Sequence, residues 1–191
     1  FSSIKAISQY TVEEILEMGI DGFWIGYEGT RSNYAKQQGR PVPEILTEFR
    51  EHGITVLASM IVGFDYQNQE VVAKELDGLM QLKPSLAQFL IYGPVPGTPF
   101  YERIIKENLL QDRYTTDRDL FYRRADGFRT MIKHPTLSPE EIEAIQEWCF
   151  KEDFERLGPS IYRVLETRLL GYRKLKDSPN PRAEMSEIET V

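Results

Sequence analysis

The sequence predicts an α/β fold with parallel strands, and three observations support this class. Three apolar segments, at residues 22–28, 54–64 and 86–93, have the length and composition of buried strands. The segments between them are mainly polar, with apolar residues that recur at the spacing of a helix. The repeating unit of about thirty residues suits parallel strands that are joined by right-handed crossover helices.

Three helices are predicted among these strands. Thr11 and Glu14 form a capping-box pattern that starts a short helix, which ends near Met18. Apolar residues at helical spacing predict two further helices, one at residues 42–52, which a glycine follows, and one at about 70–82.

The remainder of the chain is predicted to be mainly helical. One helix is expected at residues 101–107, and a short one around Leu120 within a charged, aromatic stretch. A longer helix is expected to start at Ser138, which Pro139 and Glu141 follow. Gly158 and Pro159 are expected to end this helix. The last helix is expected at residues 160–174, and an acidic, disordered tail follows it.

Composition limits the classes of partner. The chain has 23 basic and 30 acidic residues, a formal charge of −7, which argues against a nucleic-acid or anionic membrane surface. No apolar run approaches the roughly 18 to 20 residues of a membrane helix, and the first residues do not resemble a signal peptide. We therefore expect a cytoplasmic protein.

Cysteine and histidine usage restricts metal chemistry. Cys149 is the only cysteine, so no internal disulfide and no multi-thiolate metal site can form within the chain. His52 and His134 are the only histidines, which argues against a histidine-rich zinc site. His134 precedes a proline, and we expect it to be a loop or capping residue.

A rigid loop follows the third predicted strand. Residues 91–99 read IYGPVPGTP, in which prolines fix φ and glycines allow unusual backbone conformations. Ligands bind at the carboxyl ends of parallel strands. This rule places Glu28, the Gly63–Asp65 turn and the rigid loop on one rim of the sheet.

Three segments together resemble a known family. They read IGYEGTRSNYAKQQG, EHGITVLASMIVGFD and QFLIYGPVPGTPFYE. In order and spacing they are similar to the second half of the radical S-adenosylmethionine barrel, in the members that carry a cobalamin-binding domain ahead of it. The resemblance implies a partial (β/α) barrel at residues 1–110, a helical extension at 111–176 and a tail at 177–191.

The resemblance also implies a cofactor site for S-adenosylmethionine. Glu28 matches the residue that binds the ribose hydroxyls, and Lys36 matches the basic residue that meets the methionine carboxylate. The adenine would lie against the backbone of two strand ends, at Met60, Ile61, Gly63, Tyr92, Gly93 and Pro94. Two positions depart from the family motif GxIxGxxE, because Ser59 replaces its first glycine and Tyr66 its glutamate.

The family holds a 4Fe–4S cluster with three cysteines, which this chain lacks. The resemblance therefore implies a fragment of a longer enzyme that cleaves the cofactor to a 5′-deoxyadenosyl radical or transfers methyl groups through cobalamin. Its partners would be the missing N-terminal half or a second protein chain. The isolated chain is expected to be inactive.

Two other functions stay open at this point. A degenerate half-barrel without catalysis could mediate protein assembly through the helical region after Tyr101, since open sheet edges and apolar rims favour pairing. The chain could also be an ordinary (β/α) lyase or aldolase with Glu28 or Lys36 as its active group. The sequence does not identify a substrate.

Overall fold

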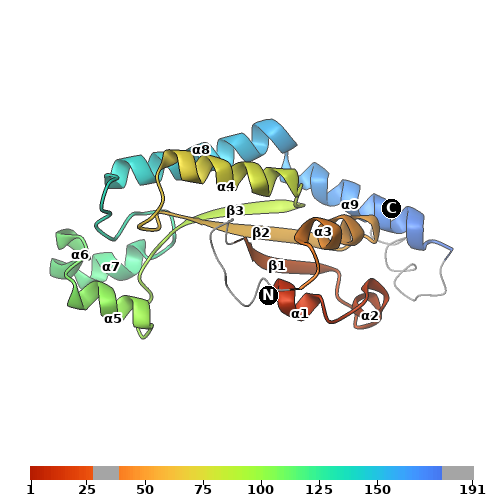
Figure 1. The fold of residues 1–191 in the computed structure, drawn as a ribbon, viewed down its shortest axis with the longest axis horizontal. Coiled ribbons are helices and arrows are strands. Elements are labelled where there is room, and N and C mark those ends of the chain that lie inside the picture. The colour runs from red at the N-terminus through yellow and green to blue at the C-terminus, as the bar shows by residue number, and fades with distance from the viewer. Residues whose placement is uncertain (28–38, 178–191) are drawn as a thin grey trace. The chain divides into compact units, whose positions relative to one another are not determined.

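The fold is an α/β fold around a three-stranded parallel sheet (Figure 1). The computed structural model describes residues 1–27 and 39–177. The strands are β1 (Gly22–Tyr27), β2 (Thr55–Val62) and β3 (Leu86–Ile91), in the spatial order β1-β2-β3. The predicted α/β class with parallel strands is confirmed. The described strands form an open sheet and do not show a barrel, so the partial (β/α) barrel stays a prediction.

The described residues form helices before, between and after these strands in the chain. The first four are α1 (Ile4–Ile7), α2 (Val12–Glu17), α3 (Val42–Glu51) and α4 (Gln69–Gln81). The others are α5 (Pro99–Lys106), α6 (Asp112–Thr116), α7 (Arg118–Arg124), α8 (Pro139–Leu157) and α9 (Ser160–Leu175). The short helix predicted around Leu120 is α7, whereas α1 and α6 were not predicted. None of the helices within the described ranges is long and apolar enough to cross a membrane.

The chain divides into two compact units, which are described separately below. Unit 1 comprises Phe1–Met60, Asp77–Gln88 and Glu152–Val191, and unit 2 comprises Ile61–Leu76 and Phe89–Lys151. The domain boundaries at residues 110 and 176 stay a prediction. The predicted disordered tail falls on residues 178–191, outside the described residues.

Burial alternates along β2. Its even-numbered residues, from Val56 to Val62, are buried, whereas the odd-numbered ones are partly exposed. Successive side chains of a strand point to opposite faces of the sheet. One face of β2 is therefore covered and the other is partly open.

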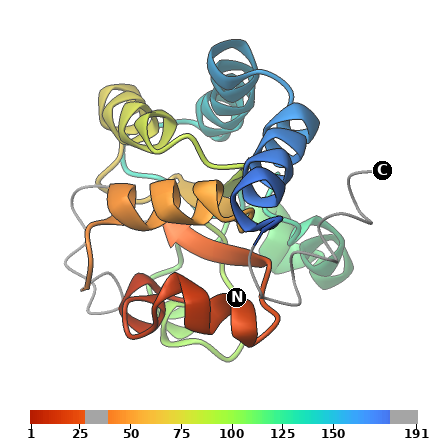
Figure 2. The same cartoon turned by 90° about the vertical axis from the view of Figure 1, so that its right-hand side faces the viewer.

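Unit 1 is built on the pairing of β1 with β2, whose register runs from Gly22 opposite Thr55 to Tyr27 opposite Met60. Figure 2 shows α3 and α9 on one side of β1, and α1 and α2 on the other. Helices α3 and α9 contact each other. At the contact, a Cβ atom on Gly171 would overlap the Cα atom of Gly53, so the two backbones pack directly together.

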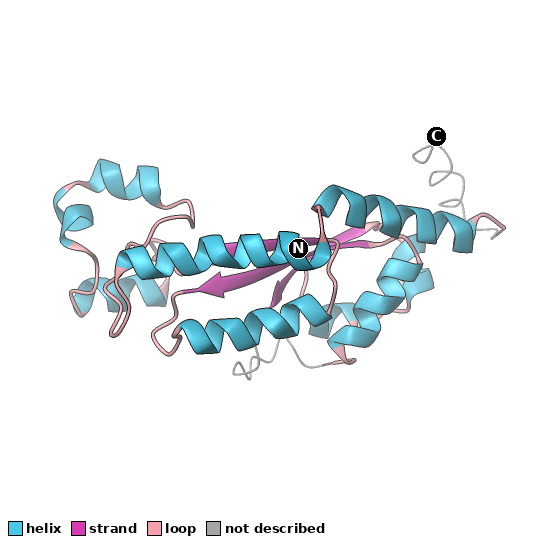
Figure 3. Cartoon of the chain, turned by 90° about the horizontal axis from the view of Figure 1, so that it is seen from above, coloured by secondary structure: helices cyan, strands magenta, loops and turns pink. Residues whose placement is uncertain are grey.

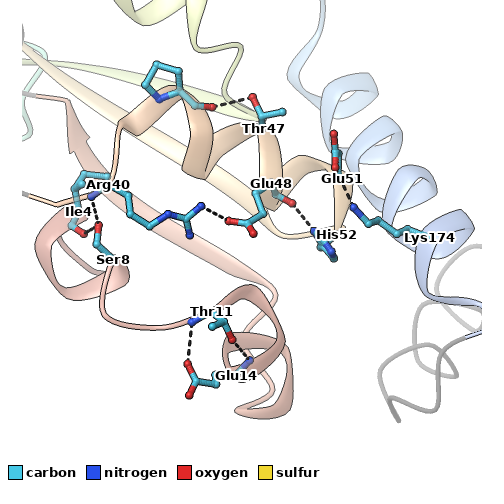
Figure 4. A network of polar contacts seen from close by, with 11 residues as sticks. Ile4, Ser8, Thr11, Glu14, Arg40, Thr47, Glu48, Glu51, His52 and Lys174 are labelled. Carbon is cyan, nitrogen blue, oxygen red and sulfur yellow. Dashed lines mark hydrogen bonds and ion pairs between the residues drawn. The ribbon is translucent and has the colours of Figure 1, made fainter.

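Polar contacts connect the helices of unit 1 (Figure 4). The Arg40 guanidinium binds Glu48 of α3 at 2.7 Å, and its backbone N–H donates to the Ser8 hydroxyl after α1 at 2.9 Å. Lys174 of α9 binds Glu51 of α3 at 3.0 Å. These contacts hold α1, α3 and α9 together within the unit.

Unit 2 has a separate apolar cluster beneath its short helices. Figure 3 shows α5, α6 and α7 joined by short loops. The buried residues that pack together there are Ile104, Leu110, Tyr114, Phe121 and Met131. An antiparallel bridge between Leu110 and Ile132 holds the later segment against the end of α5. The charged, aromatic stretch thus folds over its own core.

Candidate functional site

Two predicted site residues lie outside the described part of the chain. Glu28 and Lys36 both fall within residues 28–38. Their predicted contacts with ribose and with the methionine carboxylate therefore stay predictions. The other six residues lie at or after the ends of β2 and β3, and all of them are described: Met60, Ile61, Gly63, Tyr92, Gly93 and Pro94.

A buried glutamine holds the turn that follows β2. The Gln67 Oε1 atom accepts hydrogen bonds from the N–H groups of Gly63 at 2.7 Å and Phe64 at 2.9 Å. Its Nε2 group donates to the Ile61 carbonyl at 3.2 Å and to the Glu75 carboxylate at 2.7 Å. Gln67 and Glu75 are only 2% and 3% exposed. Because hydrogen bonds strengthen away from water, this network fixes the turn in one conformation.

The loop after β3 is joined to β2 and to α5. The Tyr92 N–H donates to the Val62 carbonyl at 2.7 Å, which ties the ends of the two strands together. Gly97 has a φ of 84°, a conformation that glycine adopts without strain. Thr98 then caps α5 by accepting a hydrogen bond from the Tyr101 N–H at 3.2 Å. These contacts hold both ends of the loop, and its rigidity stays a prediction.

Aromatic rings form a continuous row across these strand ends. Ring centroids are 5.5 Å apart between Tyr66 and Phe64, 4.4 Å between Phe64 and Tyr92, and 4.1 Å between Tyr92 and Phe100. The Arg103 guanidinium lies over the Phe100 ring, 5.4 Å from its centroid. This aromatic row borders two cavities of unit 2.

The first cavity, called the β3-loop cavity below, has a volume of about 520 Å³. Four of the predicted adenine residues line it, and the segment after α7 closes it on another side. Its lining includes Ile61, Tyr92, Gly93, Pro94, Gly127 and Met131. The structure therefore brings residues of β2 and of the rigid loop to one cavity.

The second cavity, called the α5 cavity, has a volume of about 340 Å³. Its apolar floor consists of Ile104, Leu109, Ile132 and Ile142, and it shares Ile91, Tyr92 and Phe100 with the β3-loop cavity. Gly63, another predicted adenine residue, lines the α5 cavity. Met60 belongs to unit 1, and its side chain is buried.

No protein-family model matches the chain, and none of the curated proteins is detectably similar to it. Within residues 1–27 and 39–177, no three His, Cys, Asp or Glu side chains gather in an arrangement that could hold a metal ion. The function is therefore inferred from the two cavities and their chemistry.

A segment of unit 2 binds the edge of β3. The Ile91 N–H donates to the Gly127 carbonyl at 2.7 Å. The Gln146 Nε2 group of α8 donates both to the Phe89 carbonyl at 2.7 Å and to the Gly127 carbonyl at 2.9 Å. Gly127 has a φ of 80° and a Cβ there would lie 2.8 Å from a Leu90 methyl, so glycine is required. The strand edge is covered at this end.

His134 supports the turn after β2 as a neutral imidazole. Its Nδ1 atom accepts hydrogen bonds from the Leu137 N–H at 3.0 Å and the Thr136 N–H at 3.2 Å. The remaining ring proton is therefore on Nε2, which donates to the Phe64 carbonyl at 2.9 Å. The prediction that His134 is a loop or capping residue is confirmed.

A charge pair lies beside the β3-loop cavity. Glu143 accepts hydrogen bonds from Arg129 at 2.7 Å and from the Thr130 N–H at 3.0 Å. The hydrogen bond that Arg129 donates to Glu143, together with the negative charge of Glu143, raises the pKa of Arg129 above its ordinary value. Arg129, which lines the cavity, therefore stays positively charged.

Sequence reasoning did not find four residues that shape the site: Gln67, Gln146, His134 in its bridging role, and Arg103. Gln146 carried a signal, because it is a polar residue on the otherwise apolar face formed by Ile142, Ile145 and Cys149. Gln67 carried none, since three of its four partners are backbone groups whose geometry the sequence does not reveal.

Proposed function

We propose that this chain is the half of a radical S-adenosylmethionine enzyme barrel that holds the adenosine portion of the cofactor. The observation that carries the proposal is that Ile61, Tyr92, Gly93 and Pro94, from two different strand ends, line one cavity. Three parallel strands in an open sheet are also what half of such a barrel would contain.

The β3-loop cavity suits a flat heterocycle. Its volume of about 520 Å³ lies in the range of small-molecule sites. Tyr92 and Phe100, whose rings stack at 4.1 Å, give the cavity an aromatic part of its wall. The prolines of the loop have no N–H group, and the backbone carbonyl oxygens that the loop contributes can accept hydrogen bonds from an exocyclic amino group. Because the loop is expected to be rigid before binding, little conformational entropy should be lost when a ligand binds.

The rest of the cofactor would be held by residues 28–38. A Glu28 carboxylate can accept hydrogen bonds from both ribose hydroxyls, and a Lys36 ammonium can pair with the methionine carboxylate. Both assignments rest on the resemblance of the sequence to the family.

The residues of this chain do not fit the iron–sulfur cluster of the family. A cluster needs three thiolates, whereas the single cysteine, Cys149, is buried in α8. We therefore assign reductive cleavage to the 5′-deoxyadenosyl radical, or methyl transfer with cobalamin, to a longer parent protein. The chain alone should bind the nucleoside weakly and should not catalyse a reaction.

Gly93→Val tests the adenine site. A Cβ at Gly93 would contact only the Ile91 carbonyl, at 3.8 Å, so the variant should fold normally while filling part of the cavity. We expect saturation-transfer NMR to detect adenosine bound to the chain, more strongly than inosine, and binding to fall about tenfold in the variant. Ala6→Val, on exposed α1, is the control for added volume. Equal adenosine binding by Gly93→Val and wild type would refute the site.

Glu28→Ala in the longer parent tests the ribose role. Loss of a carboxylate that accepts two hydroxyl hydrogen bonds should weaken S-adenosylmethionine binding about tenfold. Glu17→Ala, at the exposed end of α2, controls for the loss of one charge. Unchanged cofactor affinity in Glu28→Ala would remove Glu28 from the site and leave the adenine assignment to be judged by Gly93→Val.

A second candidate function is a non-catalytic module for protein assembly. It is favoured by exposed apolar side chains of unit 1 at the end of α8 and in α9, namely Phe154, Ile161, Tyr162 and Leu165, which are 54–68% exposed. Exposed apolar groups that lie close together mark interaction surfaces. This function does not require any nucleoside site, so the adenosine experiment separates the two candidates.

A further inference from the structure

The α5 cavity has the features of a small-molecule site of its own. Its floor is aliphatic, and the stacked rings of Tyr92 and Phe100 form part of its wall. Its volume of about 340 Å³ is at the small end of the range for ligand sites. An apolar group of the size of a phenyl ring or a branched alkyl chain suits this interior.

Two opposite charges in the lining of the cavity have no ion-pair partner in the described part of the chain, although Arg103 also lies over the Phe100 ring. Arg103 and Glu107 are four residues apart and both line the α5 cavity. At the same spacing, Lys74 and Glu70 pair at 2.7 Å, and Arg123 and Asp119 pair at 2.6 Å. Neither Arg103 nor Glu107 forms an ion pair with any residue of the described ranges.

The other charged or hydrogen-bonding side chains of the lining either have partners in the protein or are carboxylates. Lys133 binds Asp112 at 2.8 Å, so its charge is compensated. Both ring nitrogens of His134 are engaged with backbone groups. Asp65 adds a second carboxylate to the lining. Among residues 1–27 and 39–177, the lining therefore holds one cation without an ion pair, Arg103, together with the carboxylates of Glu107 and Asp65.

We infer that the α5 cavity binds a free α-amino acid with a large apolar side chain. The side chain occupies the aliphatic floor. The carboxylate of the ligand binds the Arg103 guanidinium, whose fork of donors matches a carboxylate. The ammonium group binds Glu107 and Asp65. A ligand with only one charge would leave either the cation or the carboxylates of the lining without a partner.

This inference does not rest on the proposed function, because it concerns a different ligand and different charged residues. The two can fail separately. Gly93→Val, which fills the β3-loop cavity, should leave amino-acid binding unchanged, since Gly93 does not line the α5 cavity.

Methyl NMR of the full chain tests the inference with L-phenylalanine, 3-phenylpropionate and 2-phenylethylamine, which share a phenyl group and differ in charge. L-phenylalanine should shift the methyl signals of Ile104, Leu109, Ile132 and Ile142 saturably. Each one-charge analogue should bind about fivefold more weakly, as the loss of one exposed ion pair predicts.

Two charge variants complete the test. Arg103→Gln should weaken the binding of L-phenylalanine about fivefold and leave the binding of 2-phenylethylamine unchanged. Glu107→Gln should leave the binding of 3-phenylpropionate unchanged. Arg123→Gln, which breaks an exposed ion pair outside the cavity, is the control. Equal binding of the three ligands would overturn the amino-acid assignment. Absence of the methyl shifts, or shifts confined to Ile161 and Leu165 of α9, would overturn the site.

Discussion

Gln67 connects four partners with one amide group, and all four lie between residues 61 and 75. Two of them are backbone N–H groups of the turn after β2, at Gly63 and Phe64. A buried polar side chain of this kind determines local backbone geometry more strongly than the apolar residues around it, because each unmet hydrogen bond has a free-energy cost.

Gln67→Leu should destabilise the chain by about 2 kcal/mol, because the two N–H groups lose their acceptor and the Glu75 carboxylate loses a donor. Urea unfolding followed by circular dichroism measures the change. Gln69→Leu, an exposed position at the start of α4, should stay within about 0.5 kcal/mol of wild type. Equal midpoints for the two variants would show that Gln67 does not hold the turn.

At this scale the sequence predicted the glycine- and proline-rich loop after β3 but not the side chains that hold the turn after β2. Gly93 and Pro94 are visible because glycine and proline have distinctive backbone preferences. Gln67 and Arg103 are ordinary polar residues, and their roles depend on which groups the fold brings within a few ångströms.

Helices α3 and α9 pack through glycine. The backbone of Gly171 in α9 approaches Gly53, which follows α3 and has a φ of 76°. Lys174 and Glu166 of α9 form ion pairs with α3 on either side of this contact, at 3.0 Å and 2.8 Å. Exposed ion pairs contribute little to the free energy of folding. The close approach of the two backbones is therefore the contact that determines how the helices pack.

Gly171→Ala should destabilise the chain by about 2 kcal/mol, although alanine is the better helix former, because the new methyl overlaps Gly53. Thermal unfolding measures the effect. Arg173→Ala, on the exposed side of α9, is the control and should change stability little. A raised melting temperature in Gly171→Ala would mean that the helices do not approach as closely as described.

The start of α8 makes stability depend on pH. The hydrogen bond from the Ser138 N–H, at 2.7 Å, and then that from the Ser138 hydroxyl, hold the pKa of Glu141 below its ordinary value. A carboxyl group with a lowered folded-state pKa stabilises the fold above its unfolded pKa, and this contribution is lost as the pH falls through the folded value.

Glu141→Gln should therefore be less stable than wild type at neutral pH, and the difference should shrink below about pH 4.5, the ordinary value. Urea midpoints at several pH values measure it. Glu140→Gln removes a charge from the same first turn and controls for net charge. A difference that is constant from pH 7 to pH 3 would contradict the capping role.

Elements were predicted where a local pattern determines them. The strands, the capping box of Thr11 and the helix after Ser138 all appear within about two residues of their expected bounds, because apolar periodicity and caps are local. Helix α1, with four residues, and α6, with five, are too short for periodicity to show. They are stabilised by packing in their own units, which the sequence does not display.

At the scale of the whole molecule, the chain should self-associate if the exposed apolar residues of α9 are an assembly surface. Sedimentation velocity should show a coefficient that rises with concentration, and Leu165→Lys should reduce this rise. Val95→Lys, at an exposed loop position in unit 2, is the matched control. A strict monomer at every concentration would remove the assembly function.

The two hydrogen bonds that Gln146 donates to the Phe89 and Gly127 carbonyls also limit the order in which unit 2 can fold. Its two acceptors lie 57 and 19 positions earlier in the chain, so during synthesis β3 emerges long before the amide that binds it. Closing so long a loop is entropically slow compared with forming a helix. The Phe89 and Gly127 carbonyls thus gain their bonds from Gln146 only when α8 docks, and we expect this docking to be a late step of folding in this unit.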